Sequence, residues 1–261
     1  MIRRTRTLLF VLFLALSAIP SAILSVPQVE AGEDFLMSVS PSPVAVNQGG
    51  SVQCVVRVRS LDGFNEAVSL SLSYMWSFSG FGASISPSLI IPPPDGSAYS
   101  VVTIEVASTV AAGSYSLLVY GSGGGITRSI VLEVRVGSAG TAGYTISVSP
   151  SHRTITPGSD VTFTVTVTST NGFNDYIDLL LGELPDKASA YFNPDIVHVE
   201  PSAPTTSTLS ISTSVDLAEG VYYWAIYGLS LSYYYYVSNT SIVTLSVTEV
   251  PDFEISISPS G

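Results

Sequence analysis

Charged side chains are scarce in this chain of 261 residues, at 11% of all positions, against about 25% in an average soluble domain. Lys187 is the only lysine, and Lys and Arg together number 9 against 20 for Asp and Glu. Nucleic-acid binding needs clustered Lys and Arg side chains. The formal net charge of −11 therefore argues against a nucleic-acid partner. Ser, Thr, Asn and Gly must keep the surface hydrated.

Cysteine is nearly absent too, because Cys54 is the single one in the chain. One thiol cannot form an internal disulfide, so a disulfide framework is excluded and stability must come from packed cores. A sustained helical period of apolar residues is also lacking. The lack of a helical period favours β-structure.

The N-terminus has the pattern of a secretory signal peptide. A basic start is formed by Arg3, Arg4 and Arg6. An apolar run, Leu8–Ile19, follows with a single interruption by serine. We expect cleavage after Ala31, with a second candidate site after Ala18, and therefore a secreted mature chain.

An uncleaved membrane anchor is the competing interpretation, because apolar character continues to Val29. Pro20 and Pro27 interrupt that stretch, whereas a spanning helix takes about 20 clean apolar residues. A second apolar span is not visible near the C-terminus. We therefore expect no membrane span after removal of the signal.

The sequence repeats itself with a period of 109 residues. The pattern aromatic-x-x-Ser-x-Ser-Pro begins at positions 35, 144 and 253, in Phe35–Pro41, Tyr144–Pro150 and Phe253–Pro259. Later matches keep the order, with Gly63-Phe64-Asn65 on Gly172-Phe173-Asn174 and Gly113-Ser-Tyr115 on Gly220-Val-Tyr222. Ordered matches over a whole period indicate tandem structural units.

The matches divide the chain into five parts. We expect a signal peptide at 1–31, a first repeat at 34–137, a Gly- and Ala-rich linker at 138–143, and a second repeat at 144–249. The segment 252–261 matches the first strand of the repeats, so it is interpreted as the start of an incomplete third repeat.

Each repeat has the alternation typical of half-buried strands. Valine or phenylalanine alternates with threonine over 161–168, and Val52, Cys54, Val56 and Val58 form the matching strand of the first repeat. Period two indicates a strand with one buried and one exposed face. Short strands separated by turns, in units of about 100 residues, indicate an antiparallel β-sandwich.

These landmarks resemble the tandem immunoglobulin-like or fibronectin-type-III-like modules of archaeal and bacterial cell-surface proteins. They are also similar to the module that accompanies prokaryotic α-galactosidases. The resemblance implies an all-β fold of tandem antiparallel Ig-like sandwiches with about seven strands each. It implies an extracellular role but no reaction, because one fold hosts many functions. Cys54 stands where such domains can carry a disulfide, but Phe163 is its counterpart and no partner thiol exists.

Several motifs have a structural interpretation. Tyr115 and Tyr222 follow a Gly-x at the expected start of one strand, where a tyrosine hydroxyl pins the corner between sheets by bonding to backbone. Asp-Gly at 62–63 and Asn-Gly at 171–172 supply the positive φ of tight turns. Phe64 and Phe173, next in sequence, are expected to cap the cores.

Calcium is the alternative for these turns, with Asp62 and Glu66 in the first repeat and Asp175 and Asp178 in the second as candidate ligands. Calcium takes six to eight oxygen ligands, and neither loop holds a dense acidic run. We therefore predict no metal and no cofactor.

Catalytic motifs are not evident. His152 and His198 lie away from Cys or acidic pairs at metal-binding spacing, so we expect solvated strand-edge or loop positions. A Gly-x-Ser-x-Gly elbow is missing. The Gly-rich segment 121–125 is expected to be a hairpin turn. The prediction is a non-enzymatic protein.

The second repeat carries an inserted hairpin rich in tyrosine. The tyrosines proposed to form an outer contact face are Tyr233, Tyr234, Tyr235, Tyr236, Tyr223 and Tyr227. Exposed aromatic side chains favour protein contact or sugar stacking. An inter-domain or inter-subunit contact, a carbohydrate and a plain surface all stay open. Asn239 begins an Asn-x-Ser sequon, a glycosylation site if the host modifies Asn.

The segment 252–261 would present Phe253, Ile255 and Ile257 without a sheet to join, and an isolated strand is unstable in water. Either the chain belongs to a longer repeat array, or this segment is a donor strand for a neighbouring molecule.

The function expected from the sequence is that of a secreted, non-catalytic structural or spacer protein of the cell surface, with protein partners or self-association. The alternative is a carbohydrate-binding or adhesive accessory region of a larger secreted hydrolase or adhesin.

Overall fold

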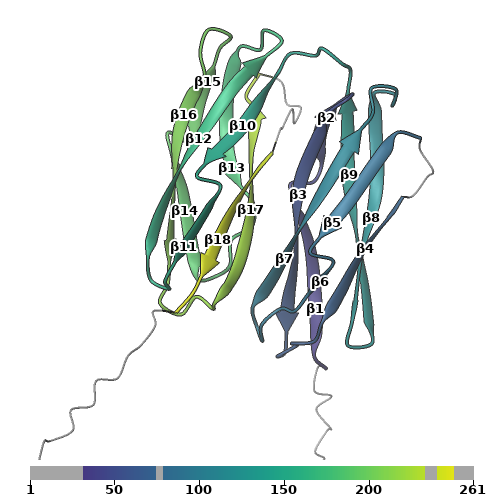
Figure 1. The fold of residues 1–261 in the computed structure, drawn as a ribbon, viewed down its shortest axis with the longest axis vertical. Helices are drawn as coiled ribbons and strands as arrows, with labels where there is room; N and C mark the ends of the chain where they lie inside the picture. The colour runs from purple at the N-terminus through teal and green to yellow at the C-terminus, as the bar shows by residue number, and fades with distance from the viewer. Residues whose placement is uncertain (1–31, 75–78, 233–239, 250–261) are drawn as a thin grey trace, which may run out of the picture. The chain divides into compact units, whose positions relative to one another are not determined.

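Alternating apolar and hydroxyl side chains form the strands that the pattern predicts. The apolar residues of Val161–Val167 are buried, and the threonines between them are exposed or half-buried. The computed structural model describes residues 32–74, 79–232 and 240–249, and all regular secondary structure in these ranges is β-strand (Figure 1). The predicted all-β fold of Ig-like sandwiches is confirmed.

The strands form two β-sandwiches, here called sandwich 1 and sandwich 2. Sandwich 1 contains β1 (Asp34–Ser40), β2 (Val44–Asn47), β3 (Ser51–Leu61), β4 (Val68–Tyr74), β5 (Phe81–Ser86), β6 (Leu89–Ile90), β7 (Ser97–Val106), β8 (Gly113–Gly123) and β9 (Ile126–Gly137). Sandwich 2 contains β10 (Gly143–Ser149), β11 (His152–Ile155), β12 (Asp160–Thr170), β13 (Asp175–Leu181), β14 (Ala188–Asn193), β15 (Ile196–Val199), β16 (Thr205–Thr213), β17 (Gly220–Ser230) and β18 (Ser241–Val247).

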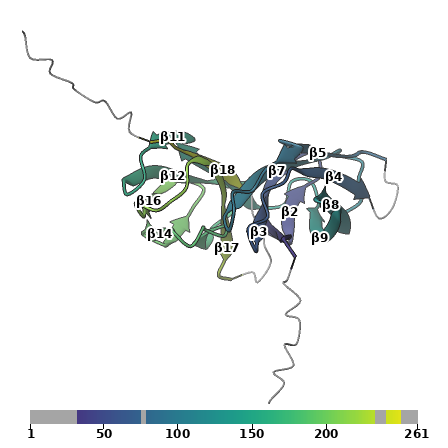
Figure 2. The ribbon, with the colours of Figure 1, turned by 90° about the horizontal axis from the view of Figure 1, so that it is seen from below.

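The two sandwiches have the same strand order. In sandwich 1 a four-stranded sheet, β1-β3-β7-β5, faces a five-stranded sheet, β2-β9-β8-β4-β6. Sandwich 2 repeats this arrangement with β10-β12-β16-β14 and β11-β18-β17-β13-β15. Figure 2, seen from below, looks along many of these strands. Strand pairing is antiparallel except for β2 with β9 and β11 with β18, which are parallel.

Within the described ranges each sandwich has nine strands, more than the expected seven or so, for two local reasons. The first segment of each repeat divides in two, because Pro41 and Pro150 lack the N–H that would continue the ladder. After the proline the chain crosses to the opposite sheet as β2 or β11. Short edge strands, β6 and β15, account for the remaining difference.

Matching inward positions fill the two cores. Cys54 and Phe163 occupy the same place on β3 and β12, and both are buried. Cys54 is a free thiol, and burial raises its pKa far above its ordinary value. It is an inert core residue, since reactive cysteines need an accessible thiolate.

No helix within the described ranges has the length and apolar composition needed to cross a membrane. Several predicted features lie outside the described residues: the signal peptide 1–31, Tyr233, Tyr234, Tyr235, Tyr236, Asn239, Phe253, Ile255 and Ile257. These stay predictions.

Candidate functional site

Two tyrosines hold equivalent corners of the sandwiches. On β8 the hydroxyl of Tyr115 donates to the carbonyl oxygen of Ala111 at 2.6 Å, and on β17 that of Tyr222 donates to Ala218 at 2.7 Å. Each bond ties the start of a strand to the connection that precedes it. The predicted tyrosine corner is confirmed, so these hydroxyls serve the fold.

The glycine turns have the predicted backbone geometry. Asp62 and Asn171 have φ of 52° and 53°, in the left-handed region. Phe64 and Phe173 are buried and close one end of each core. Phe64 packs on Phe35, with ring centroids 5.1 Å apart, as Phe173 packs on Tyr144.

The calcium candidates are not gathered into a ligand set. In the parts of the chain that the structure describes, no group of three or more His, Cys, Asp or Glu residues is arranged to hold a metal ion. Asp62 and Glu66 are both exposed at the 62–63 turn, and the backbone N–H of Gly63 bonds instead to Asp95, at 3.2 Å.

Asp175 is an internal anchor, because its carboxylate oxygens are occupied by hydrogen bonds. They accept bonds from the Ser230 hydroxyl, the Ser232 hydroxyl at 2.7 Å, the Ser232 N–H at 3.1 Å and the Tyr176 N–H at 2.8 Å. Burial raises the pKa of Asp175, but these hydrogen bonds outweigh it and hold the pKa below its ordinary value. The ionised group fixes the end of β17 to β13.

Asp178 lies on the outward face of β13, two residues beyond Tyr176. It pairs across the ladder with Ile196 of β15, which follows Asp195. Burial and the neighbouring charge of Asp195 both raise the pKa of Asp178. Among the described residues, no ion pair neutralises either of the two carboxylates.

Both histidines lie on exposed edge strands, as predicted. His152 on β11 is 2.9 Å from the hydroxyl of Ser246. His198 on β15 places Nε2 2.9 Å from the side-chain oxygen of Asn174. Its ring packs against that of Tyr176 in a tilted arrangement, with centroids 4.6 Å apart and planes 32° apart. This ring pair was not foreseen.

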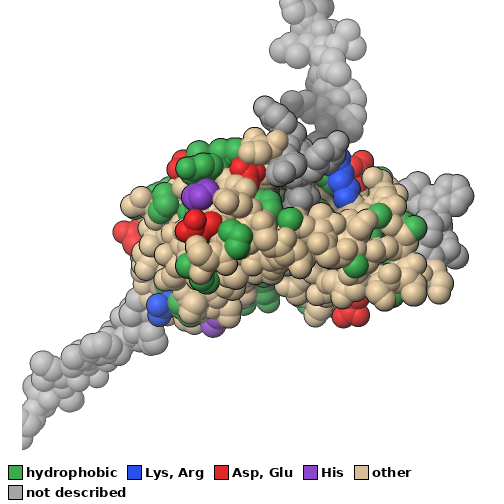
Figure 3. All heavy atoms as spheres, turned by 90° about the horizontal axis from the view of Figure 1, so that it is seen from above, with side chains coloured by type: hydrophobic (Ala, Val, Ile, Leu, Met, Phe, Trp, Pro, Cys, Tyr) green, Lys and Arg blue, Asp and Glu red, His purple; other side chains and the backbone are tan. Residues whose placement is uncertain are grey.

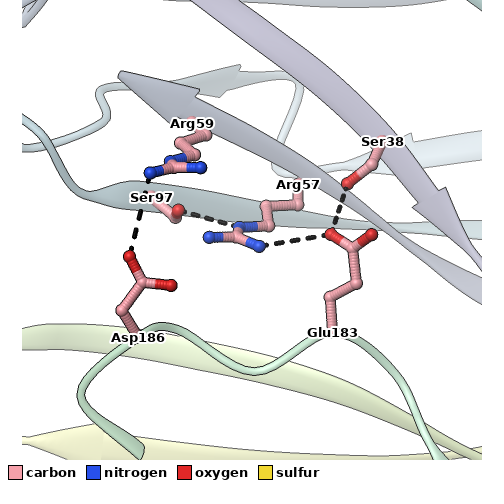
Figure 4. A network of polar contacts seen from close by, with 6 residues as sticks. All are labelled: Ser38, Arg57, Arg59, Ser97, Glu183 and Asp186. Carbon is pink, nitrogen blue, oxygen red and sulfur yellow. Dashed lines mark hydrogen bonds and ion pairs between the residues drawn. The ribbon is translucent and has the colours of Figure 1, made fainter. Parts of the chain in front are cut away.

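A polar network joins the outer face of sheet β1-β3-β7-β5 to the segment that follows β13 (Figure 4). Arg57 Nη1 lies 3.2 Å from Glu183 Oε2, and the Ser38 hydroxyl donates to the same oxygen at 2.9 Å. Arg57 Nε also donates to the Ser97 hydroxyl at 2.8 Å. Arg57 is largely buried, with 14% of its side chain exposed, whereas Glu183 stays 56% exposed, so solvent screens this contact in part.

A second ion pair extends the network, with Arg59 Nη2 3.8 Å from Asp186 Oδ2. Both partners are largely exposed, and surface pairs of this kind contribute little, about 0–1 kcal/mol.

Apolar and aromatic contacts lie beside these polar ones. Val55 and Tyr99 of sandwich 1 are buried in the same hydrophobic cluster as Tyr222 and Trp224 of sandwich 2. The rings of Tyr99 and Tyr222 are 5.7 Å apart. Burial raises the pKa of Tyr99 to about 12. The cluster therefore runs continuously across the junction.

Tyr223 takes part in this junction, whereas Tyr227 lies further along β17. Both side chains are half-buried. Tyr223, Trp224 and Ala225 line a cavity of about 10 Å³ together with Val55 and other residues of sandwich 1. A contact between domains was one of the uses foreseen for the tyrosine face. Tyr223 lines the junction, and the use of the whole face stays a prediction.

A free strand edge is also closed at the junction. β1 ends opposite Val55, so the backbone of Gln53 has no neighbouring strand on that side. The Thr240 hydroxyl accepts from the Gln53 N–H at 3.1 Å and donates to the Gln53 carbonyl. Buried or edge backbone groups need such partners.

Sequence reasoning overlooked Arg57 and Tyr99 at the junction, and it did not foresee that Tyr176 and His198 would pair. Each of these is an outward residue of a strand, without a motif. A signal did exist in the repeat alignment, because Arg57 and Tyr99 match Thr166 and Thr206. A charged or aromatic residue on one repeat, against threonine on the other, marks a position with a special role.

No protein-family model matches the chain, and no curated protein matches it. Solved structures do match. The D00-D0 domain of intimin has 12% identity and a TM-score of 0.29, over 80% of this chain and 99% of that one. Fibronectin(III)-like modules of CbhA from Clostridium thermocellum have 13% identity and a TM-score of 0.27, over 85% and 100%. Domains 4–9 of the surface layer protein SbsC have 16% identity and a TM-score of 0.36, over 82% and 31%.

These matches include the tandem immunoglobulin-like and fibronectin-like modules that the sequence resembles. At such identities and TM-scores the likeness concerns the kind of fold and says nothing of activity.

Proposed function

We propose that the chain is a secreted, non-catalytic structural or spacer protein of the cell surface, in which the two sandwiches act as one stiff body. The junction is the observation that carries this proposal. Val55 and Tyr99 are buried among residues of sandwich 2. Separating the sandwiches would expose this apolar surface to water at a free-energy cost.

Stiffness is what distinguishes a spacer from a flexible tether. Inter-domain motion is the default where the contact is small and polar. Here apolar burial, the Arg57–Glu183 pair and the Thr240–Gln53 hydrogen bonds act at different points of one junction. Contacts at several points restrain rotation as well as separation, so a fixed orientation follows.

The hydrogen bonds that polar side chains make within the fold also support a structural role. The hydroxyls of Tyr115 and Tyr222 bond to backbone, and the carboxylate of Asp175 is held by Ser230 and Ser232. These groups stabilise the fold. The proposed location rests on the basic and apolar N-terminus and on the low charge of the chain.

Spin-label distances would test the stiffness. Cys54 is buried, so cysteines added at the exposed Thr127 and Thr162 are the sites that a label reaches. We expect one narrow distance distribution, which broadens in the Tyr99→Ala variant because the shared cluster is lost. A broad distribution in the unmodified junction would show that the repeats move independently and would overturn the stiff-spacer proposal.

Location and absence of turnover need separate measurements. Antibody labelling of intact cells of the source organism should detect the chain, and a hydrolase substrate panel should show no turnover. Turnover that is lost when His152 or His198 is replaced would make the protein an enzyme.

A further inference from the structure

A preorganised aromatic platform lies on the outward face of β13 and β15 in sandwich 2. Tyr176 is 53% exposed and packs against His198, its cross-strand partner. A single exposed aromatic ring is common on protein surfaces. Tyr176 differs because a second ring, acidic side chains and exposed apolar side chains lie on the same two strands and the turn beside them.

Hydrogen bonds hold the backbone of Tyr176 and the ring of His198. The Tyr176 N–H donates to Asp175, and its carbonyl accepts from the Leu231 N–H at 3.0 Å. The ring of His198 is fixed by its bond to Asn174, 2.9 Å away. Little conformational entropy would then be lost on binding, which favours affinity.

Hydrogen-bond acceptors lie next to the ring. Asp178 points to the same face as Tyr176, because side chains two residues apart on a strand share a face. Asp195 directly precedes Ile196, the cross-strand partner of Asp178. Burial and then the charge of Asp195 raise the pKa of Asp178. Ile196 and Leu231, 43% and 48% exposed, add apolar surface at the rim. Figure 3, seen from above, shows a histidine side chain close to acidic and hydrophobic ones.

Sandwich 1 lacks this combination at the same edge. Ala67 and Ile91 stand at the positions of Tyr176 and His198, and Ser69 at that of Asp178. The platform is therefore not a requirement of the fold, since sandwich 1 forms the same strands without it.

We propose that the Tyr176–His198 platform binds an uncharged glycan, with a sugar ring stacked on Tyr176 and its hydroxyls donating to Asp178 and Asp195. A sugar ring presents C–H groups on its face and hydroxyls at its edge, which match an aromatic face bordered by acceptors. Unpaired carboxylates and a net charge of −11 repel anionic polymers. The apolar area is small, so a glycan suits it better than a protein surface does.

Affinity electrophoresis of the full chain in native gels tests this proposal, with hydroxyethyl cellulose, laminarin, mannan and xylan as neutral probes and alginate as the anionic one. We expect at least one neutral polymer to retard the chain and alginate to leave its mobility unchanged. Tyr176→Ala should weaken that retardation about tenfold, and Asp178→Asn should weaken it less.

Tyr191→Ala is the matched control, because Tyr191 is 63% exposed on β14 in the other sheet. It should leave binding unchanged, and thermal unfolding should show that every variant folds. The proposal is wrong if no neutral polymer retards the chain, if alginate binds as well, or if the Tyr176 and Tyr191 variants behave alike. The spacer proposal would survive each of those outcomes, since it depends on the junction.

Discussion

The two sandwiches share their scaffold and differ on their outer faces. Strand order, tyrosine corner and turn geometry are the same in both. On the four-stranded sheet, however, sandwich 1 presents Val55, Arg57 and Tyr99 to its neighbour, where sandwich 2 has Thr164, Thr166 and Thr206. Inward positions are constrained by packing, whereas outward positions are free to acquire a role.

The five-stranded sheets differ in the same way. Sandwich 2 carries Tyr176, His198 and Asp178 at an edge where sandwich 1 has small or aliphatic residues. It also anchors the connection after β17 through Asp175, whereas the equivalent Glu66 is exposed. One scaffold thus supports a docking face in one copy and a candidate binding face in the other.

Removing a core aromatic should have the largest effect. Trp224→Ala should destabilise sandwich 2 by about 3–5 kcal/mol, because Trp224 is 1% exposed and its loss leaves a cavity. Urea unfolding followed by circular dichroism measures the change. The equivalent Leu117→Ala should destabilise sandwich 1 by about 2–5 kcal/mol. Because only Trp224 lines the junction, only its variant should also broaden the spin-label distances.

Replacing Asp175 and its equivalent Glu66 should give the next largest difference in stability between the repeats. Asp175→Asn should cost about 1–3 kcal/mol, since it weakens hydrogen bonds to a buried charge. Glu66→Gln, at an exposed position, should change stability by less than about 0.5 kcal/mol. Equal effects of the two substitutions would contradict the anchoring role of Asp175.

The stability that Asp175 contributes should fall as the pH is lowered. Its pKa is lowered in the folded state from an ordinary value of 3.8. Its ionised form therefore contributes stability above that value, and the contribution is lost as pH falls through the lower folded pKa. The difference in unfolding free energy between the native chain and Asp175→Asn should shrink in acid below about pH 4. A difference that stays constant there would argue against the hydrogen-bonded carboxylate.

Removing the hydroxyl from the two tyrosine corners should lower stability by modestly different amounts. Tyr222→Phe should destabilise sandwich 2 by about 1 kcal/mol, because the carbonyl of Ala218 loses its donor at a largely buried site. Tyr115→Phe should cost less, since water can replace the lost bond at a more exposed corner. Thermal unfolding compares them, and a larger loss for Tyr115 would reverse the interpretation.

The junction ion pair should give the smallest effect. A double-mutant cycle with Arg57→Ala and Glu183→Ala should show a coupling of about 0.5–1 kcal/mol. Lys187 and Asp216, 3.9 Å apart and exposed, form a control pair with coupling near zero. If the control pair shows the same coupling energy as Arg57 and Glu183, then the burial of Arg57 does not strengthen its ion pair.

Much of the fold could be predicted from local chemistry. Alternation over 161–168 defines β12, and Asp-Gly at 62–63 defines a turn by its left-handed backbone. The tyrosine corners followed from the Gly-x-Tyr spacing. The splitting of the first strand was not predicted, because a proline ends a ladder without showing which sheet the chain joins next.

The candidate sites were harder to predict from the sequence than the fold. Asp175 and Asp178 were singled out, but as calcium ligands, because counting oxygens does not show which are already bonded. His198 was interpreted alone, since its partner Tyr176 is 22 positions away in sequence and meets it only through the β13–β15 ladder.

The sequence by itself determined the two sandwiches, because period-two alternation, turn residues and an internal period are local properties that any folded copy must obey. Only the tertiary structure decided what the outward residues do. Arg57 meets Glu183, and Tyr176 meets His198, through pairings between distant segments. Such meetings depend on strand register and on how two surfaces pack, and a one-residue change of register would turn each side chain to the opposite face.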